Sequence, residues 1–306
     1  MALHRLAAVT MGVPNVSETC SYYAEFGLIP DSDGWLSTLD GGRQLRIVAA
    51  PMRRLLAMQL GADDDDDIER IARNLNGIGT TVEHEPHRVS AFEPVTAVRI
   101  TAVVMDRLVQ PGVAAAPTNR PGQFDRVGER AAGVLRSGPV RPRKLGHAVL
   151  GTTNLEQTTR YFVEGFGFKI SDRIADRGAF LRCSTDHHNV LVLAAPVSFL
   201  HHTSWQVDDV DEVGRGASAM LEADPARHVW GLGRHHAGSN FFWYLKDPAG
   251  TFSEYYSDLD CIIDDQLWTP EVFEGARGLF NWGPPPPPSF LNPDDLGALM
   301  ANIHTH

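Results

Sequence analysis

Two stretches of this sequence, far apart along the chain, repeat one pattern. Residues 6–15 (LAAVTMGVPN) and 145–154 (LGHAVLGTTN) are apolar segments that both end in Gly, two further residues and Asn. Each is followed by a helix-like stretch and then by Phe-Gly, at residues 16–27 and 155–167. Self-similarity at this scale indicates two copies of one structural unit.

The repeat divides the 306 residues into four parts. We expect an N-terminal domain over residues 1–135, a linker over 136–144, a second domain over 145–262 and a Pro-rich tail over 263–306. The segments 55–60 (LLAMQL) and 200–205 (LHHTSW) support this division, because acidic residues and a predicted helix follow each of them. The five aspartates at 63–67 fit a helix start, since they lack the alternating spacing of a calcium-binding loop.

The charge balance limits what the protein can bind. Lys and Arg total 27 against 38 Asp and Glu, a formal net charge of -11. Because nucleic acids and anionic membranes are bound by basic surfaces, we expect neither as a partner. The three cysteines form no CxxC motif and no stretch approaches 18 apolar residues, so we expect a protein of the reducing cytoplasm.

Two histidines and a glutamate form a candidate metal site in the second copy. His147 lies in its first apolar segment, His202 in the strand-like run 199–207, and Glu254 in the run 250–256. Side chains of these types on neighbouring strands can bind a divalent metal ion on one face. They leave coordination positions open, as in the facial triad of non-haem Fe(II) sites.

The repeat supplies an internal control for this site. Ala8 and Ala57 occupy the positions that correspond to His147 and His202, and residues 95–105 contain no carboxylate. A buried histidine held by hydrogen bonds is the ordinary interpretation of any single such residue. Ligands that occur in only one of two copies favour metal binding instead.

Side-chain alternation predicts which member of the pair His201-His202 is the ligand. Residues two apart on a strand share a face. His201 is therefore expected beside Trp205, on an apolar face under a helix, and His202 beside Ser204, facing a cavity. This favours His202 as the metal ligand.

Six short motifs follow one another in the second copy. They are Gly146-His147, the Asp-His-His-Asn motif that contains His188, His201-His202, Gly233-Arg234-His235, Tyr244-Leu-Lys-Asp-Pro-Ala-Gly250 and Glu254-Tyr255. In their order and spacing the second copy resembles the catalytic domain of the type I extradiol catechol dioxygenases, of the vicinal oxygen chelate superfamily. The resemblance is strongest over residues 145–256.

The resemblance implies a fold, a cofactor and an activity. The fold is α+β, with two tandem domains, each of two βαβββ modules that form a curved, funnel-like mixed sheet with helices outside. The cofactor is Fe(II), with Mn(II) as the alternative, bound by His147, His202 and Glu254. The enzyme would be a cytoplasmic oxidoreductase, a homo-oligomer, that cleaves a substituted catechol with O2 next to its two hydroxyl groups, in the catabolism of aromatic compounds.

The resemblance also implies roles for residues around the metal. His188 would be the acid–base and oxygen-stabilising group, with His187 as the alternative, because a register slip of one residue exchanges the faces of a strand. His235 and Tyr244 would hydrogen-bond the bound hydroxyl and the developing negative charge. Val149 is expected to line the substrate pocket with these three residues.

Two other functions stay open at this point. A metal-dependent isomerase or lyase of the same superfamily, such as a glyoxalase, would use the two histidines and the glutamate, but not His188, His235 and Tyr244 together. A non-catalytic protein that binds a small molecule would fit the first copy. The prolines at 284–288 are expected to form a rigid strap over their own domain, and the catechol's substituents are left open.

Overall fold

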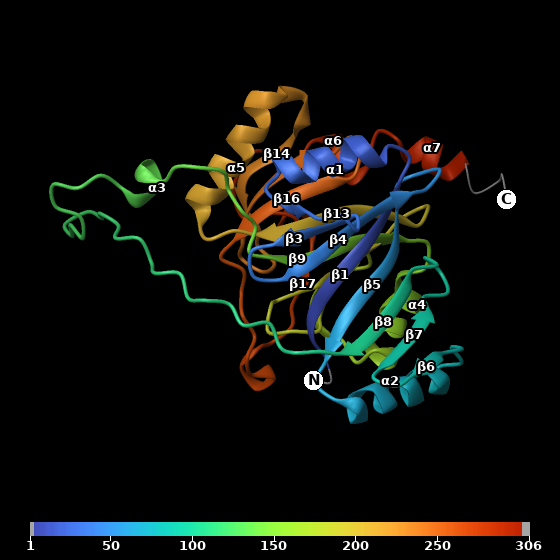
Figure 1. Ribbon diagram of the computed structural model, residues 1–306. Helices are drawn as coiled ribbons and strands as arrows, with labels where there is room; N and C mark the ends of the chain where they lie inside the picture. Colours follow the sequence, from blue (N-terminus) through green and yellow to red (C-terminus); the bar gives the residue numbers. More distant parts are fainter. Residues whose placement is uncertain (1–2, 302–306) are drawn as a thin grey trace.

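The computed structural model describes residues 3–301, which form two β-sheets with helices on their outer faces (Figure 1). The first sheet has the strand order β2-β3-β4-β1-β5-β8-β7-β6. Its strands are β1 (Leu3–Val13), β2 (Ile29–Pro30), β3 (Trp35–Thr38), β4 (Gly42–Ala49), β5 (Arg54–Ala62), β6 (Glu83–Glu85), β7 (Arg88–Phe92) and β8 (Arg99–Val104). The helices of this half are α1 (Val16–Glu25) and α2 (Asp65–Gly77).

The second sheet has the order β14-β15-β16-β13-β9-β12-β11-β10-β17. Its strands are β9 (Lys144–Thr152), β10 (Lys169–Ile174), β11 (Gly178–Arg182), β12 (Val190–Ala194), β13 (Phe199–Gln206), β14 (His228–Arg234), β15 (Phe241–Lys246), β16 (Phe252–Ser257) and β17 (Val272–Phe273). The helices of this half are α4 (Leu155–Arg160), which continues as the π-helix η1 (Tyr161–Gly165), α5 (Val210–Ala223) and the short η2 (Pro225–Arg227).

Both sheets follow one topology. The units β1-α1-β2-β3-β4 and β5-α2-β6-β7-β8 recur as β9-α4-β10-β11-β12 and β13-α5-β14-β15-β16. Read from opposite ends, the two strand orders agree, and β17 is one strand added to the edge of the second sheet. The predicted α+β class with four βαβββ modules is therefore confirmed.

Local chemistry explains where the longer helices begin. The Asp64 side chain caps α2 by accepting a hydrogen bond from the Asp67 backbone N–H at 3.0 Å. Acidic residues at this end also favour the helix dipole. Asp209 caps α5 in the same way, so the aspartate run at 63–67 lies at a helix start, as its position in the sequence indicates.

The two halves share one hydrophobic core. Phe26, which follows α1, stacks on Tyr255 of β16 with ring centroids 3.7 Å apart. Arg53, just before β5, is buried and donates hydrogen bonds to the Leu200 carbonyl in β13 and to both carboxylate oxygens of Asp295. The first half therefore braces a central strand of the second.

The alternation expected around His201 is wrong. The register between β13 and β9 shifts between Leu200 and His202, and again between Ser204 and Trp205. Both histidines consequently line one cavity, whereas Trp205 lies in the core. A bulge resets the alternation of a strand, and nothing in the local residue pattern announces it.

The tail runs back across the second half. It contains η3 (Asp265–Leu267), β17, η4 (Gly275–Gly278), α6 (Pro288–Leu291) and α7 (Leu296–Ala301). The Arg234 backbone N–H donates to the Trp282 carbonyl at 2.9 Å, and the Trp230 indole N–H donates to the Pro284 carbonyl at 2.7 Å. The tail thus straps its own domain, with the polyproline run lying beside β14.

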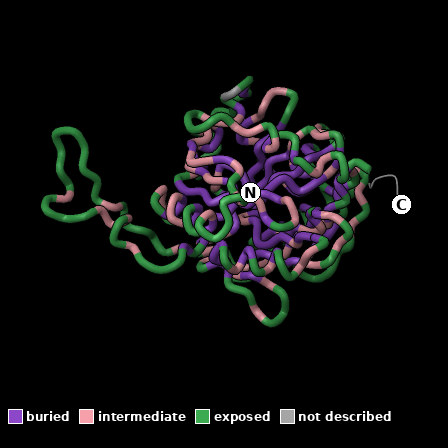
Figure 2. Tube along the Cα trace, turned by 90° about the horizontal axis from the view of Figure 1, so that it is seen from above, coloured by how far each residue is buried: buried purple, intermediate pink, exposed green. Residues whose placement is uncertain are grey.

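One segment leaves the body of the molecule. Residues 108–131, which we call the arm, extend outward between β8 and the short helix α3 (Ala132–Leu135), as both views show (Figures 1 and 2). Most arm residues are exposed, and Gln110 near the start of the arm donates hydrogen bonds to Asp40 and Gln206 of the body. Among the helices of residues 3–301, none combines the length and the hydropathy of a membrane-spanning segment.

Candidate metal centre

Three neighbouring strands bring the candidate ligands together. His147 lies on β9, His202 on β13 and Glu254 on β16. Ser204 of β13 pairs with His147 on one side and with Glu254 on the other. All three ligand side chains are buried, and one ligand atom of each lies within 4.8 Å of the other two.

One nitrogen of each histidine and one oxygen of Glu254 lie close enough together to bind a single ion between them. His147 Nε2 is 3.1 Å from Glu254 Oε2 and 3.4 Å from His202 Nε2, and His202 Nε2 is 3.6 Å from Glu254 Oε2. Glu254 Oε2 is buried and accepts no hydrogen bond. A buried carboxylate oxygen without a partner is costly, so the arrangement suits a cation at its centre.

The electrostatics suit a divalent metal ion. Burial lowers the pKa of His202 well below its ordinary value, with a further contribution from His201. Burial alone would raise the pKa of Glu254, but the imidazoles of His147, His235 and His202 hold that pKa well below the ordinary range. A neutral imidazole at His202 and an ionised carboxylate at Glu254 are the forms that metal binding requires. The residues present therefore fit the metal.

The strand register supports the internal control. In the first sheet Ala8 pairs with Gln59, Gln59 with Thr101, and Ala57 with Thr10. The corresponding pairs in the second sheet are His147 with Ser204, Ser204 with Glu254, and His202 with Val149. Ala8, Ala57 and Thr101 thus stand at the three ligand positions. The first copy keeps the backbone and has no ligand there.

His188 lies beside the triad, and His187 lies behind it. The His188 ring centroid is 4.2 Å from that of His147, and His188 lines the cavity. His187 points away, with Nε2 2.8 Å from Asp172 Oδ2 and its ring against Trp268. Burial, followed by the neighbouring His147, lowers the pKa of His188 well below its ordinary value. The structure therefore places His188, and not the alternative His187, at the cavity.

His235 and Tyr244 form a hydrogen-bonded pair on another side of the cavity. His235 Nε2 is 2.8 Å from the Tyr244 hydroxyl, and His235 Nδ1 donates to the Leu279 carbonyl of the tail. Burial raises the pKa of Tyr244 well above its ordinary value, and Glu254 adds to the effect. Tyr244 therefore keeps its proton, and its hydroxyl donates the hydrogen bond to His235.

Several residues of the site have no counterpart in the sequence prediction. Asn240 donates to Glu254 Oε1 at 3.1 Å, and Asp172 holds His187. His201, predicted to face a helix, lines the cavity next to Phe290 of the tail. For His201 the sequence offered one signal, its place in a His-His pair. Asn240 and Asp172 belong to no motif, so the sequence offered no signal for them.

The cavity at the triad is small and mostly apolar. Its volume is about 70 Å³, and the tail closes it through Gly278, Leu279, Phe290 and Leu291. Its other lining residues are His147, Ile174, Phe180, His188, Leu191, Leu193, His201, His202, His235, Ala237 and Tyr244. Val149 is not among them: it packs behind the wall, in a cluster with Phe180 and Leu191.

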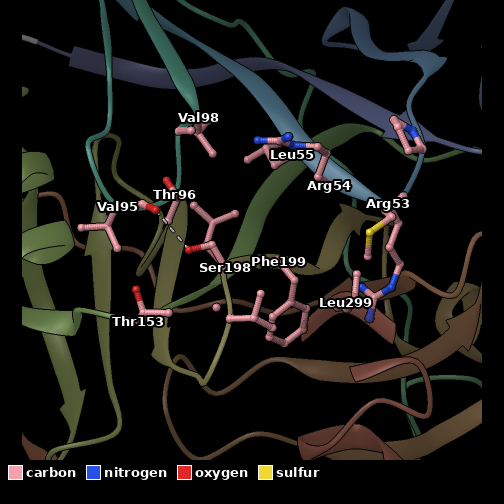
Figure 3. Close-up of a pocket in the computed structure, with 16 residues that line it drawn as sticks. Arg53, Arg54, Leu55, Val95, Thr96, Val98, Thr153, Ser198, Phe199 and Leu299 are labelled. Atoms are coloured by element: carbon pink, nitrogen blue, oxygen red, sulfur yellow. Dashed lines mark hydrogen bonds between the residues drawn. The ribbon is translucent and has the colours of Figure 1, made fainter. Parts of the chain in front are cut away.

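A second cavity, of about 560 Å³, lies between the two halves (Figure 3). Its walls come from both copies and include Leu55, Val98 and Phe199. Ser198 donates a hydrogen bond to the Val95 carbonyl across it at 3.3 Å. It contains none of the candidate ligands. Its wall contains the start of β13, three residues before His202, so the two sites share a strand.

The fold and the converging ligands define a protein of paired βαβββ modules with the donors for one metal ion in its second half. Residues 144–255 match the model of the Glyoxalase/Bleomycin resistance protein/Dioxygenase superfamily.

Individual relatives are similar over about half of the chain. Metapyrocatechase 2 of Cupriavidus necator is 39% identical over 168 residues, which are 54% of this chain and 52% of that protein. The iron-dependent extradiol dioxygenase of Rhodococcus jostii (strain RHA1) is 30% identical over 154 residues, 45% of this chain and 50% of that protein. Each match thus spans about half of the relative's length.

A solved structure extends the likeness in fold to nearly the whole chain. The Mn(II)-bound glyoxalase from Novosphingobium aromaticivorans superimposes with a TM-score of 0.74 and 25% sequence identity. The superposition covers 92% of this chain and 90% of that one. The first copy is therefore part of a shared two-domain plan.

Proposed function

We propose that this protein is an extradiol dioxygenase, which opens the ring of a substituted catechol with O2 at a mononuclear non-haem Fe(II) centre. One observation carries the proposal: His188, His235 and Tyr244 surround the buried triad of His147, His202 and Glu254. Metal ligands alone fit several activities, whereas a proton-transfer group and a hydrogen-bonding pair beside them fit few. The names of the two similar relatives support the same activity.

The metal would be held by one face of the second sheet. His147, His202 and Glu254 would hold Fe(II) there, and the metal would supply Lewis acidity toward the catechol and reactivity toward O2. Mn(II) suits the same ligands and is the alternative metal; the similar proteins include an iron-dependent and a Mn(II)-bound one. Asn240, by donating to Glu254 Oε1, keeps the other carboxylate oxygen turned toward the histidines.

The surrounding side chains would handle protons and exclude water. His188 Nδ1 is 3.0 Å from His187 Nδ1, so its Nε2 is the atom free to take and return a proton at the cavity. Tyr244 Oη, 2.8 Å from His235 Nε2, can turn its hydrogen bond toward negative charge on the substrate. Phe180, Leu191 and Phe290 line the remaining wall with apolar surface, which keeps water away.

An isomerase or lyase activity is the second candidate. The Mn(II)-bound glyoxalase with the same overall fold favours it. That activity needs the triad and an acid–base group, and it gives no reason for the pair of His235 and Tyr244 beside His188. We therefore rank it below ring cleavage, and a non-catalytic binding protein below both.

Oxygen consumption tests the proposal. The full chain, reconstituted anaerobically with Fe(II), is mixed with 3- and 4-substituted catechols, and O2 uptake and the yellow ring-opened product are recorded. We expect both with at least one catechol. His188→Ala should retain iron but lose roughly 10²-fold or more in kcat, whereas His202→Ala and Glu254→Ala should lose the iron. Bound iron without O2 uptake on any catechol would favour the isomerase or lyase.

We also propose a homo-oligomer and a cytoplasmic location. The arm supports the first, because it exposes apolar side chains and extends away from its own body (Figure 2). Three free cysteines, one of them exposed, support the second, since such thiols suit a reducing compartment. We also propose domains over residues 1–135 and 145–262, a linker over 136–144 and a tail over 263–306. The eight strands of the first sheet, all before residue 105, and the strands β9 to β16, over 144–257, support this division, although β17 of the tail joins the second sheet.

A further inference from the structure

The cavity contains two histidines that are each preceded by another buried histidine. We propose that His187 and His201 are positioning residues, each of which fixes the tautomer of the histidine that follows it. The inference rests on the proposed function, in which His188 transfers a proton and His202 binds the metal. Each of these roles requires a ring nitrogen with a free lone pair at the cavity. In both pairs the neighbouring Nδ1 atoms face each other, at 3.0 Å and 2.7 Å.

In the second pair the direction of every hydrogen bond follows from its acceptor. His201 Nε2 is 2.6 Å from the Phe290 carbonyl oxygen, which can only accept. A neutral imidazole has one N–H, so His201 Nδ1 carries a lone pair and accepts the Nδ1–H of His202. His202 Nε2 is then free of hydrogen and points to the metal site, 3.6 Å from Glu254 Oε2.

The first pair repeats this arrangement with a different acceptor. His187 Nε2 is 2.8 Å from Asp172 Oδ2, and Asp172 Oδ1 accepts the Glu271 backbone N–H at 2.7 Å. His187 therefore donates from Nε2 and accepts the Nδ1–H of His188. His188 Nε2 is left with a lone pair at the cavity. Asp172, His187 and His188 are all buried, so water does not compete for these bonds.

The tail supplies a part of both chains of hydrogen bonds. The Phe290 carbonyl belongs to α6, and the Glu271 N–H precedes β17, which pairs with the strand of Asp172. Trp268 also donates its indole N–H to the Ser171 carbonyl and lies against the His187 ring. The tail thus sets which nitrogen of His188 and of His202 reaches the cavity. Outer hydrogen bonds of this kind orient metal ligands in general.

The direct test measures the tautomers by nitrogen NMR on the full chain. With ¹⁵N-labelled histidine and the metal removed by a chelator, His188 and His202 should show hydrogen on Nδ1 and none on Nε2. Asp172→Asn should reverse the first pair. Its amide oxygen can still accept from Glu271, and its NH2 group then faces His187 Nε2. His188 should become the Nε2–H tautomer, which a residue with a merely structural role would not cause.

Kinetics and metal affinity give two further readouts. With Fe(II) bound, Asp172→Asn should lose at least about tenfold in kcat, with little change in KM or iron content. Asp176→Asn, at an exposed turn of the same hairpin, is the matched control and should change neither. His201→Leu should weaken Zn(II) binding roughly 10- to 100-fold. His201→Gln should restore most of it, because the glutamine oxygen can accept from His202.

The wild-type spectrum alone can overturn the inference. Hydrogen on Nε2 of either His188 or His202 would refute it, as would an unchanged His188 tautomer in a folded Asp172→Asn variant. Equal Zn(II) affinity of His201→Leu and the wild type would refute the second pair. Neither the NMR spectra nor the Zn(II) affinities need a catechol. They can therefore refute the tautomer assignment while O2 uptake supports ring cleavage, or support it while O2 uptake is absent.

Discussion

At the scale of single residues, Asp247 shows how burial changes an ionisable group outside the metal site. It follows β15, and its Oδ1 accepts backbone hydrogen bonds from Ala249 and Thr251 at 2.9 Å each. Its Oδ2 accepts from the Tyr23 hydroxyl at 3.3 Å, across the boundary between the halves. Burial raises the pKa of Asp247 to about 7, although these hydrogen bonds oppose the effect.

This raised pKa predicts a loss of stability with rising pH. The unfolded chain releases the Asp247 proton near the ordinary aspartate pKa of 3.8 and the folded chain near 7, so the folded state binds more protons between these values. The free energy of unfolding then falls across this window. Asp247→Asn has no such proton to lose. The difference in free energy of unfolding between this variant and the wild type should therefore rise, in favour of the variant, by on the order of 2 kcal/mol from pH 5 to pH 7. Urea unfolding of the metal-free proteins measures it, with the exposed Asp176→Asn as control. Parallel curves for wild type and Asp247→Asn would contradict the assignment.

The same scale shows what the sequence could predict about the site. His147, His202 and Glu254 could be predicted, because the duplicated strand pattern offers a comparison copy in which Ala8 and Ala57 stand in place of the two histidines. Asp172 and Asn240 could not be predicted, because neither belongs to a motif and their roles come from contacts with His187 and Glu254 that only the folded sheet creates. The orientation of His201 was predicted wrongly, since the bulge in β13 is a tertiary feature.

At the scale of elements, helix α6 of the tail is held mainly by one side chain. Phe290 is 5% exposed, and its ring centroid lies 4.7 Å from that of Tyr244 and 4.8 Å from that of Trp230. The sequence indicated a Pro-rich strap. It did not indicate that Phe290 would close the cavity, because the proline run fixes local backbone and not where the chain after it lands.

Truncation of this ring should weaken the attachment of the tail. Phe290→Ala removes a buried aromatic side chain and should lower the free energy of unfolding by about 3 kcal/mol. Leu267→Ala, in the same tail but 82% exposed, should change it by less than about 0.5 kcal/mol. Urea titration followed by tryptophan fluorescence compares the two. Similar losses would show that Phe290 does not anchor the tail.

At the scale of the whole molecule, the arm is the one long segment, among residues 3–301, that extends away from both sheets. It carries Val109, Phe124 and Val127, which are 84%, 69% and 81% exposed. Exposed apolar side chains on a segment that extends from the body can be buried by contact with another chain. Sequence periodicity could not place this segment, since it follows neither a strand nor a helix pattern.

The arm predicts an assembly that depends on its apolar residues. The full chain should sediment as a species larger than its 33.6 kDa monomer. Replacing Val109, Phe124 and Val127 together by Ser should weaken the association at least about tenfold, because their burial in an interface is lost. Phe92→Ser, at an exposed site on β7, should leave the sedimentation unchanged. A monomeric wild type, or a triple variant that assembles normally, would contradict this prediction.

The matched registers of the two sheets have a consequence for how such a site can be gained or lost. Ala8, Ala57 and Thr101 stand on backbone that pairs as the ligand-bearing strands do. The copies therefore differ at these positions by three side chains and not by their strand pairing. Substitutions at three positions of the first copy could therefore create a second set of ligands, and loss of the three side chains in the second copy could remove the site, without a change of strand pairing in either sheet.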